Sequence, residues 1–268
     1  MKIAILVKIV PNVDDFKYDY ENNILIRDDI KMIINPDDAS AIEYVLKMKD
    51  KNRDIFIEVI TMGPKSVIPV LEDVCRRNID KGTIISDKAF QGSDTYSTSI
   101  ILSEYIKMQK YDLILGGTNS LDGDTGHVLN QIAEYLNMWN FSNILDFNID
   151  ENIIKFKADI NDEIIELEYT LSHKECVILG ITRESRKKLR YVRFDDFKLD
   201  VSNKLKIVDN NMLKINKDIV GLNGSPTKVK KTFVKTYSKV EKQIVENNDE
   251  GIQKVYDLLK SKGVINNV

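Results

Sequence analysis

Residues 111–134 have the sequence YDLILGGTNSLDGDTGHVLNQIAE, and this stretch decides the fold. It opens with a short apolar run at 113–115, which is typical of a buried parallel strand. Gly116 and Gly117 end the strand, a polar loop follows, and from Val128 onward apolar residues recur at helical spacing. This order places a helix N-terminus at the carboxyl end of a strand, where free N–H groups favour an anion such as phosphate.

The glycines alone do not establish a binding site, because many α/β proteins turn in this way for packing. The loop, however, has small or hydrogen-bonding residues at six consecutive positions, which are Asp122, Gly123, Asp124, Thr125, Gly126 and His127. That density is higher than a simple turn needs, and it suits a backbone wrapped round a ligand. Two other interpretations stay open. Asp122 or Asp124 caps the helix instead of contacting a ligand, and His127 is simply a partly exposed helix residue.

Composition excludes several classes of protein. The chain has 268 residues, 43% hydrophobic and 30% charged, which predicts a globular protein with a full core. A formal net charge of −3 argues against a nucleic-acid-binding protein. No apolar run approaches the roughly 18 residues that insert across a membrane, and MKIAILVKIV indicates a first strand rather than a secretory signal. Two cysteines and two histidines exclude a typical metal site, and we expect a cytoplasmic protein.

Strands and helices alternate over residues 1–137. We expect strands at 2–10, 54–62, 83–86 and 113–115, and helices after residue 36, after Pro64, at 95–108 and after residue 127. This alternation predicts an α/β fold with a doubly wound, mostly parallel sheet. The ligand crevice of such a sheet lies beyond the carboxyl ends of its strands. We expect Asp94 to cap the helix that follows it.

The pattern changes after residue 150. Residues 153–158 and 164–170 flank a turn at Asn161-Asp162 and predict a β-hairpin, and an apolar strand follows it. Residues 201–248 show little packed pattern, so we expect an extended C-terminal arm that lies on another chain and ends in a helix. The predicted domains are therefore 1–200 and 201–268.

Residues 183–200 have the sequence RESRKKLRYVRFDDFKLD, which is dense in cations with apolar residues among them. Charge alone favours a solvated loop held by a few apolar side chains. An exposed apolar side chain in a charged rim is also a typical hot spot for a protein partner. Both interpretations stay open for this segment.

Five motifs in order resemble the beta subunit of electron transfer flavoprotein. They are ILVK at 5–8, INPDD at 34–38, TMGP at 61–64, GGTNSLDGDTGHV at 116–128 and GLNGSPT at 221–227. The resemblance covers most of the chain, including the C-terminal helix. It implies a Rossmann-like subunit that binds FAD or AMP and pairs with a larger alpha subunit, which carries the redox-active FAD.

The resemblance also implies the nucleotide site. The matching residues are Leu6, Asn35, Pro36, Asp37, Asp38, Met62, Gly63, Gly117, Thr118, Asn119, Ser120, Asp122, Gly123, Asp124, Thr125, Gly126, His127 and Val128. No side chain is expected to be catalytic, because a flavin carries the hydride chemistry itself. The DGDTG loop is similar to bacterial forms that bifurcate electrons from NADH, which favours FAD over AMP. We expect Gly117→Val to fill the nucleotide's space and leave the sheet folded.

A docking region is implied for a dehydrogenase. Arg190 and Tyr191 match the segment with which the family docks acyl-CoA dehydrogenases, and Leu189 or Phe194 would have to serve as its apolar anchor. The neighbouring residues depart from the family pattern, so another flavin dehydrogenase remains an open partner.

Two functions follow. The first is electron transfer between dehydrogenases, with NADH-oxidising activity only in a bifurcating form. The alternative is a stand-alone adenine-nucleotide sensor similar to universal stress proteins, which leaves the chain beyond residue 200 unexplained.

Overall fold

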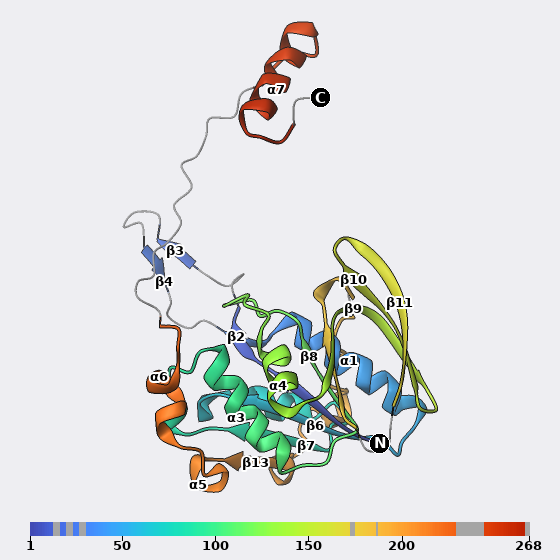
Figure 1. The fold of residues 1–268 in the computed structure, drawn as a ribbon, viewed down its shortest axis with the longest axis vertical. Coiled ribbons are helices and arrows are strands. Elements are labelled where there is room, and N and C mark those ends of the chain that lie inside the picture. Colours follow the sequence, from blue (N-terminus) through green and yellow to red (C-terminus); the bar gives the residue numbers. More distant parts are fainter. Residues whose placement is uncertain are drawn as a thin grey trace. The chain divides into compact units, whose positions relative to one another are not determined.

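The computed structural model describes residues 1–12, 17–19, 24–26, 31–171, 175–185, 187–228 and 244–265, with the backbone alone at 17–19 and 24–26. Within this part of the chain, nine strands form one sheet in the order β11-β10-β9-β12-β8-β1-β6-β7-β13 (Figure 1). They are β1 (Lys2–Val7), β6 (Phe56–Met62), β7 (Lys81–Ile85), β8 (Leu113–Gly117), β9 (Trp139–Asp150), β10 (Ile153–Ile160), β11 (Glu163–Thr170), β12 (Val177–Ile181) and β13 (Leu205–Val208). Neighbours from β9 to β13 pair in parallel, whereas β9, β10 and β11 pair antiparallel. The predicted mostly parallel sheet is confirmed.

Helices cover both faces of this sheet, as a doubly wound fold requires. On one face α1 (Pro36–Lys51) and α2 (Ile68–Cys75) contribute to an apolar cluster with the strands. On the other face α3 (Thr95–Lys107) and α4 (Val128–Leu136) contribute to a second cluster. The predicted alternation of strands and helices is therefore confirmed.

The remaining elements are short or lie outside the large sheet. They are β2 (Ile9–Pro11) with β5 (Met32–Ile34), β3 (Lys17–Asp19) with β4 (Ile24–Ile26), the helices α5 (Asn210–Leu213), α6 (Gly221–Gly224) and α7 (Asp249–Ser261), and the 3₁₀ helices η2 (Lys65–Val67), η3 (Lys88–Phe90), η4 (Arg183–Ser185), η5 (Phe194–Asp196), η6 (Ser202–Lys204) and η7 (Lys217–Ile219). Asp94 caps α3, as predicted, because its carboxylate accepts a hydrogen bond from the N–H of Ser97 at 3.0 Å.

The second half of the chain agrees with the sequence only in part. The predicted hairpin is β10 and β11, and its turn residues Asn161 and Asp162 have φ angles of 54° and 66°. The sequence does not predict β9, since polar residues interrupt its pattern and Asn143 has a φ angle of 56°. It does not predict β13 either, since four residues are too few for a periodic signal.

Contacts divide the chain into two compact units, residues 1–228 and 229–268. Residues 201–228 belong to the first unit, where Val208 and Val220 are buried in the cluster beneath α3. The structure thus differs from the predicted boundary at residue 200, because β13 pairs with β7 and carries the chain back onto the sheet. In the described part of the second unit, α7 is amphipathic and exposes Ile252, Val255 and Leu258.

A buried ionised network lies on β6, away from the carboxyl ends of the strands. The carboxylate of Glu58 is fully buried and accepts hydrogen bonds from Thr83, Tyr105 and Tyr111 at 2.6 to 2.9 Å. Lys81 pairs with it at 3.0 Å. Burial alone would raise the pKa of Glu58, but these hydrogen bonds outweigh it and lower the pKa. The folded protein therefore holds this group ionised.

We expect Glu58→Gln to lower the free energy of unfolding by about 2–4 kcal/mol at pH 7, because it leaves Lys81 unpaired and a buried hydroxyl without its acceptor. Because folding lowers the pKa of Glu58, its contribution is present above the ordinary glutamate pKa and is lost as pH falls below it. Urea unfolding from pH 3 to 7 measures both proteins. A difference that does not shrink in acid would contradict this account.

Candidate functional site

The carboxyl ends of β1 and β8 bring two distant loops together. The first is the turn into α1, with Asn35, Asp37 and Asp38, and the second is the loop that follows Gly117. Both loops contact Lys8, the residue that follows β1. Its C=O accepts a hydrogen bond from the N–H of Asn35 at 2.9 Å, and its Nζ lies 2.6 Å from Asp122 in the second loop. This is the edge at which the sequence predicts the ligand crevice.

Asp38 fastens the strand ends to α1. Its side chain is buried, and its two oxygens accept hydrogen bonds from the N–H of Lys8 at 2.7 Å and of Gly117 at 2.6 Å. Burial raises the pKa of Asp38 to about 7, although both backbone hydrogen bonds favour the ionised form. Asp38 therefore holds the polypeptide itself and is not free for a ligand.

Asn35 and Asp37 hold the next part of the loop in the same way. The amide of Asn35 donates to the C=O of Asn119 at 2.7 Å and accepts from the N–H of Leu121 at 3.0 Å. The carboxylate of Asp37 accepts from the N–H of Asn119 at 3.2 Å. Burial raises the pKa of Asp37, with the Asn119 N–H and the Arg183 cation opposing it. Three side chains at the start of α1, those of Asn35, Asp37 and Asp38, thus set the loop's path.

The outer part of the loop is held by cations and turns. Lys8 Nζ lies 2.6 Å from Asp122 and 3.3 Å from the hydroxyl of Ser120. Asp124 has a φ angle of 47° and accepts a hydrogen bond from the amide of Asn119 at 2.9 Å. Its φ and that of Gly126, 65°, turn the backbone sharply before α4.

The N-terminus of α4 carries no side-chain cap. Its N-cap residue is His127, and neither Asp122 nor Asp124 accepts a hydrogen bond from the first turn. Thr125 and His127 are exposed. The capping alternative for the two aspartates is wrong, because Lys8 and Asn119 occupy them. Uncapped N–H groups at the positive end of a nine-residue helix are suited to hold a phosphate.

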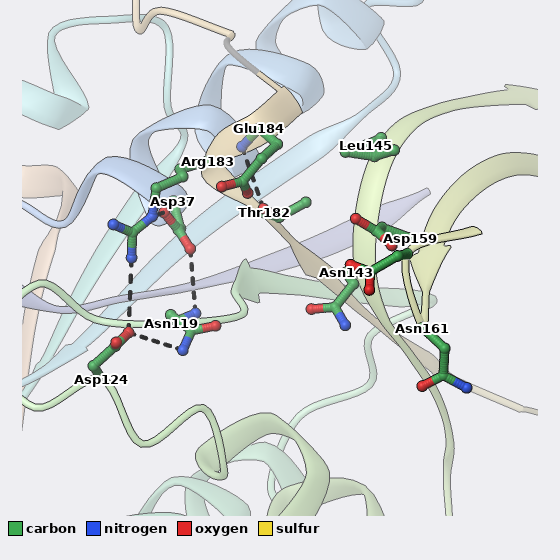
Figure 2. Close-up of a pocket in the computed structure, with 11 residues that line it drawn as sticks. Asp37, Asn119, Asp124, Asn143, Leu145, Asp159, Asn161, Thr182, Arg183 and Glu184 are labelled. Atoms are coloured by element: carbon green, nitrogen blue, oxygen red, sulfur yellow. Dashed lines mark hydrogen bonds and ion pairs between the residues drawn. The ribbon is translucent and has the colours of Figure 1, made fainter. Parts of the chain in front are cut away.

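A polar cavity of about 510 Å³ adjoins this loop (Figure 2). Its lining comprises Asp37, Asn119, Asp124, Asn143, Leu145, Asp159, Asn161, Asp162, Thr182, Arg183 and Glu184. Arg183 bridges two of these carboxylates, since its guanidinium lies 3.5 Å from Asp37 and 3.7 Å from Asp124. Five carboxylates against one guanidinium disfavour a phosphate inside the cavity, whereas they suit hydroxyl groups that donate hydrogen bonds.

Several of the predicted site residues lie in the core, in a helix or at another strand end and do not belong to the loop. Leu6 is a core residue of β1, and Val128 packs partly against the same apolar cluster. Pro36 is in the first turn of α1. Met62 and Gly63 end β6, on the far side of β1 from the loop, and the N–H of Gly63 is bound by Ile85. The backbone of Thr118 pairs with β12, and its hydroxyl accepts from the N–H of Asn143 at 3.3 Å.

Arg183 and the hairpin residues of the cavity were not among the predicted site residues, and Lys8 was included only within the ILVK segment at the rim. Lys8 has a sequence signal, because it is a cation directly after an apolar strand at the predicted rim. Arg183 stands in a cationic run and is not distinguished from its neighbours. Asp159, on β10, and Asp162, in the turn of the hairpin, line the cavity, and Figure 2 shows Asp159 on its hairpin side.

The predicted docking residues point to different surroundings. Leu189 is partly buried against the core, and Arg190 binds Glu43 and Asp50. Tyr191 and Phe194, by contrast, are 77% and 95% exposed. Of the two candidate anchors, only Phe194 is available to another protein.

A metal site requires a cluster of ligand side chains, and a membrane-spanning helix requires a long apolar run. In the described ranges, no group of three or more His, Cys, Asp and Glu side chains is arranged to hold a metal ion. No helix among those same residues is long and apolar enough to cross a membrane.

Comparison with known proteins identifies the family. The model of the electron transfer flavoprotein domain matches residues 22–188, more than half of the chain. The chain belongs to the electron transfer flavoprotein family. It is 32% identical to the electron transfer flavoprotein subunit beta of Thermoanaerobacterium thermosaccharolyticum over 99% of this chain and 100% of that protein.

Further relatives have the same character. The chain is 31% identical to the caffeyl-CoA reductase-Etf complex subunit CarD of Acetobacterium woodii, covering 87% of each chain. It is 30% identical to protein FixA of Azotobacter vinelandii, covering 93% of this chain and 89% of the relative. These matches support an electron-transfer role and not the stand-alone nucleotide sensor.

The predicted effect of Gly117→Val needs correction. A Cβ at Gly117 would lie 2.5 Å from Asp37 Cβ and 2.5 Å from Asp38 Oδ1, so a side chain would strike the first turn of α1 instead of filling a ligand's space. The close approach of loop and helix is what requires glycine here.

We therefore expect Gly117→Ala to lower the free energy of unfolding by about 1–3 kcal/mol through overpacking. Gly123→Ala is the matched control, because the nearest atom to its Cβ would be 3.7 Å away, and its effect should stay within about 0.5 kcal/mol. Guanidinium unfolding measures both variants. Equal effects would show that the contact between Gly117 and α1 does not constrain the loop.

Proposed function

We propose that this chain is the small, beta subunit of a heterodimeric electron transfer flavoprotein and binds an adenine nucleotide at the loop of residues 117–128. The observation that carries the proposal is the uncapped N-terminus of α4, presented by a loop whose path is fixed from α1. The main-chain N–H groups at 125–128 would hold the phosphate. Lys8, which is half exposed, adds a cation at the edge of the same loop.

FAD fits this site better than AMP does. Beyond the phosphate position lies the cavity of about 510 Å³, a volume within the range of small-molecule sites. Its carboxylate and amide oxygens suit the hydroxyl-rich chain that joins flavin to phosphate. FAD would supply the redox chemistry, with NADH as electron donor in a bifurcating form. The protein itself would bind and orient the cofactor and exclude water from it.

Two protein partners follow from the exposed apolar surfaces. The second unit exposes Ile252, Val255 and Leu258 on α7, as expected of a helix that packs on an alpha subunit. Tyr191, Phe194 and the neighbouring Phe197 are all exposed on the first unit, and we call these three side chains the docking crest. We assign this docking crest to a flavin dehydrogenase, of the acyl-CoA dehydrogenase kind or another.

Co-expression with a cognate alpha subunit tests the nucleotide assignment. We expect a yellow heterodimer from which acid releases two equivalents of FAD, identified by mass spectrometry, and whose second flavin is bleached by anaerobic NADH. One FAD with one AMP would support the beta-subunit assignment and overturn the choice of FAD. ATP, or a chain that forms only a self-dimer, would contradict the proposal.

We expect Phe194→Ala to raise the KM for the heterodimer about tenfold or more in a dehydrogenase-coupled assay, because it removes the most exposed apolar side chain of the crest. Heterodimer formation and flavin content should not change. Met108→Ala removes an exposed side chain at the end of α3 and is the control. Loss of the heterodimer in Phe194→Ala would show that the crest packs on the alpha subunit instead.

A further inference from the structure

The docking crest stands on a segment that has almost no regular structure of its own. Residues 187–199 contain one 3₁₀ turn, η5, and no strand. Side chains from the two helices beneath hold its main chain. Ser40 donates to the C=O of Lys187 at 3.0 Å, and Arg76 donates to the C=O of Leu199 at 3.1 Å. The crest's geometry therefore depends on α1 and α2.

The centre of this attachment is an ion pair between α1 and the crest. Glu43 is buried on α1 and accepts from both the backbone N–H of Arg190, at 2.9 Å, and its guanidinium, at 3.0 Å. Arg190 also lies 2.8 Å from Asp50, and its C=O accepts from Arg77 at 2.7 Å. Every polar group of Arg190, main chain and side chain, is thus used inside the protein.

We propose that Glu43 is a positioning residue for partner docking, which it serves by locking Arg190 so that the adjoining Tyr191 and Phe194 project into solvent in a fixed arrangement. This inference rests on the proposed docking function of the crest. It also reassigns Arg190, because a guanidinium committed to Glu43 and Asp50 is not available to bind a dehydrogenase.

A charge lock of this kind improves recognition by ordering the surface in advance. An unattached crest would have to be ordered on each encounter, and that cost appears as weaker binding. The first turn of α1 meanwhile fixes the loop of residues 117–128 through Asp37 and Asp38. One helix therefore sets both the predicted nucleotide loop and the docking crest, which keeps the distance between cofactor and partner constant.

The experiment measures electron exchange between the assembled heterodimer and an acyl-CoA dehydrogenase that accepts the wild-type heterodimer. Glu43→Gln and Arg190→Lys each keep much of the side chain's bulk, while Lys loses the planar, bidentate geometry. We expect both to raise KM about tenfold or more, with kcat and flavin spectrum within about twofold of wild type. The KM of the double variant should be no higher than that of either single variant, because either substitution alone already breaks the Glu43–Arg190 pair.

Asp80→Asn is the matched control. It breaks another ion pair made by α1, Lys49 with Asp80 at 2.5 Å, and the hydrogen-bond partners of the Asp80 side chain, Lys49 and the N–H of Ile57, both lie outside residues 187–199. It should lower stability and leave KM unchanged.

A KM unchanged in Arg190→Lys, together with a raised KM in Phe194→Ala, overturns the positioning role while the docking proposal stands. If Phe194→Ala also leaves KM unchanged, the docking proposal itself fails. If Glu43→Gln does not fold, Arg190→Lys alone decides, because its side chain is partly exposed.

Discussion

The structure depends on a carboxylate that has been removed from water at the start of α1. Asp38 accepts main-chain hydrogen bonds from the end of β1 and the end of β8, so one side chain joins a helix to two strands. A buried acceptor of this kind is costly unless both oxygens are satisfied, and here both are. It also explains Gly117, since a side chain at that position would occupy the space of the carboxylate.

The same logic extends along α1. Asn35 and Asp37 bind the loop after β8, and five residues beyond Asp38 the side chain of Glu43 binds Arg190 in the segment that carries the docking crest. These polar groups are buried, although a helix of this kind usually buries an apolar stripe. The helix therefore carries two sets of side chains, one for the core and one for the functional loops. We propose that α1 in this way fixes the separation between the nucleotide loop and the docking crest.

Periodicity predicted the parallel sheet, the helices on both faces and the hairpin, since each follows from local apolar spacing. It also predicted that the segments at 35–38, 62–63 and 117–128 share one rim, because strand ends of a parallel sheet lie at one edge. The first and the last do meet, whereas Met62 and Gly63 lie on the far side of β1. It did not predict that Asp37 and Asp38 would bind the protein itself: two acids in a first helical turn look alike whether they stabilise the dipole, hold a ligand or accept loop N–H groups. Arg183, the acids of the hairpin and β13 were missed for a related reason. Their roles depend on contacts between residues far apart in the chain. Such contacts leave no periodic or compositional signal in a single sequence.

In the proposed arrangement, a loop fixed by α1 presents the N-terminus of α4 to a nucleotide phosphate. An experimental structure of the heterodimer, purified with its nucleotides, tests it most directly. The account predicts phosphate oxygens about 2.7–3.2 Å from main-chain nitrogens at 125–128, with Asp38 still bound to Gly117 and Lys8. Phosphates inside the acidic cavity, or a nucleotide bound elsewhere on the subunit, would contradict it.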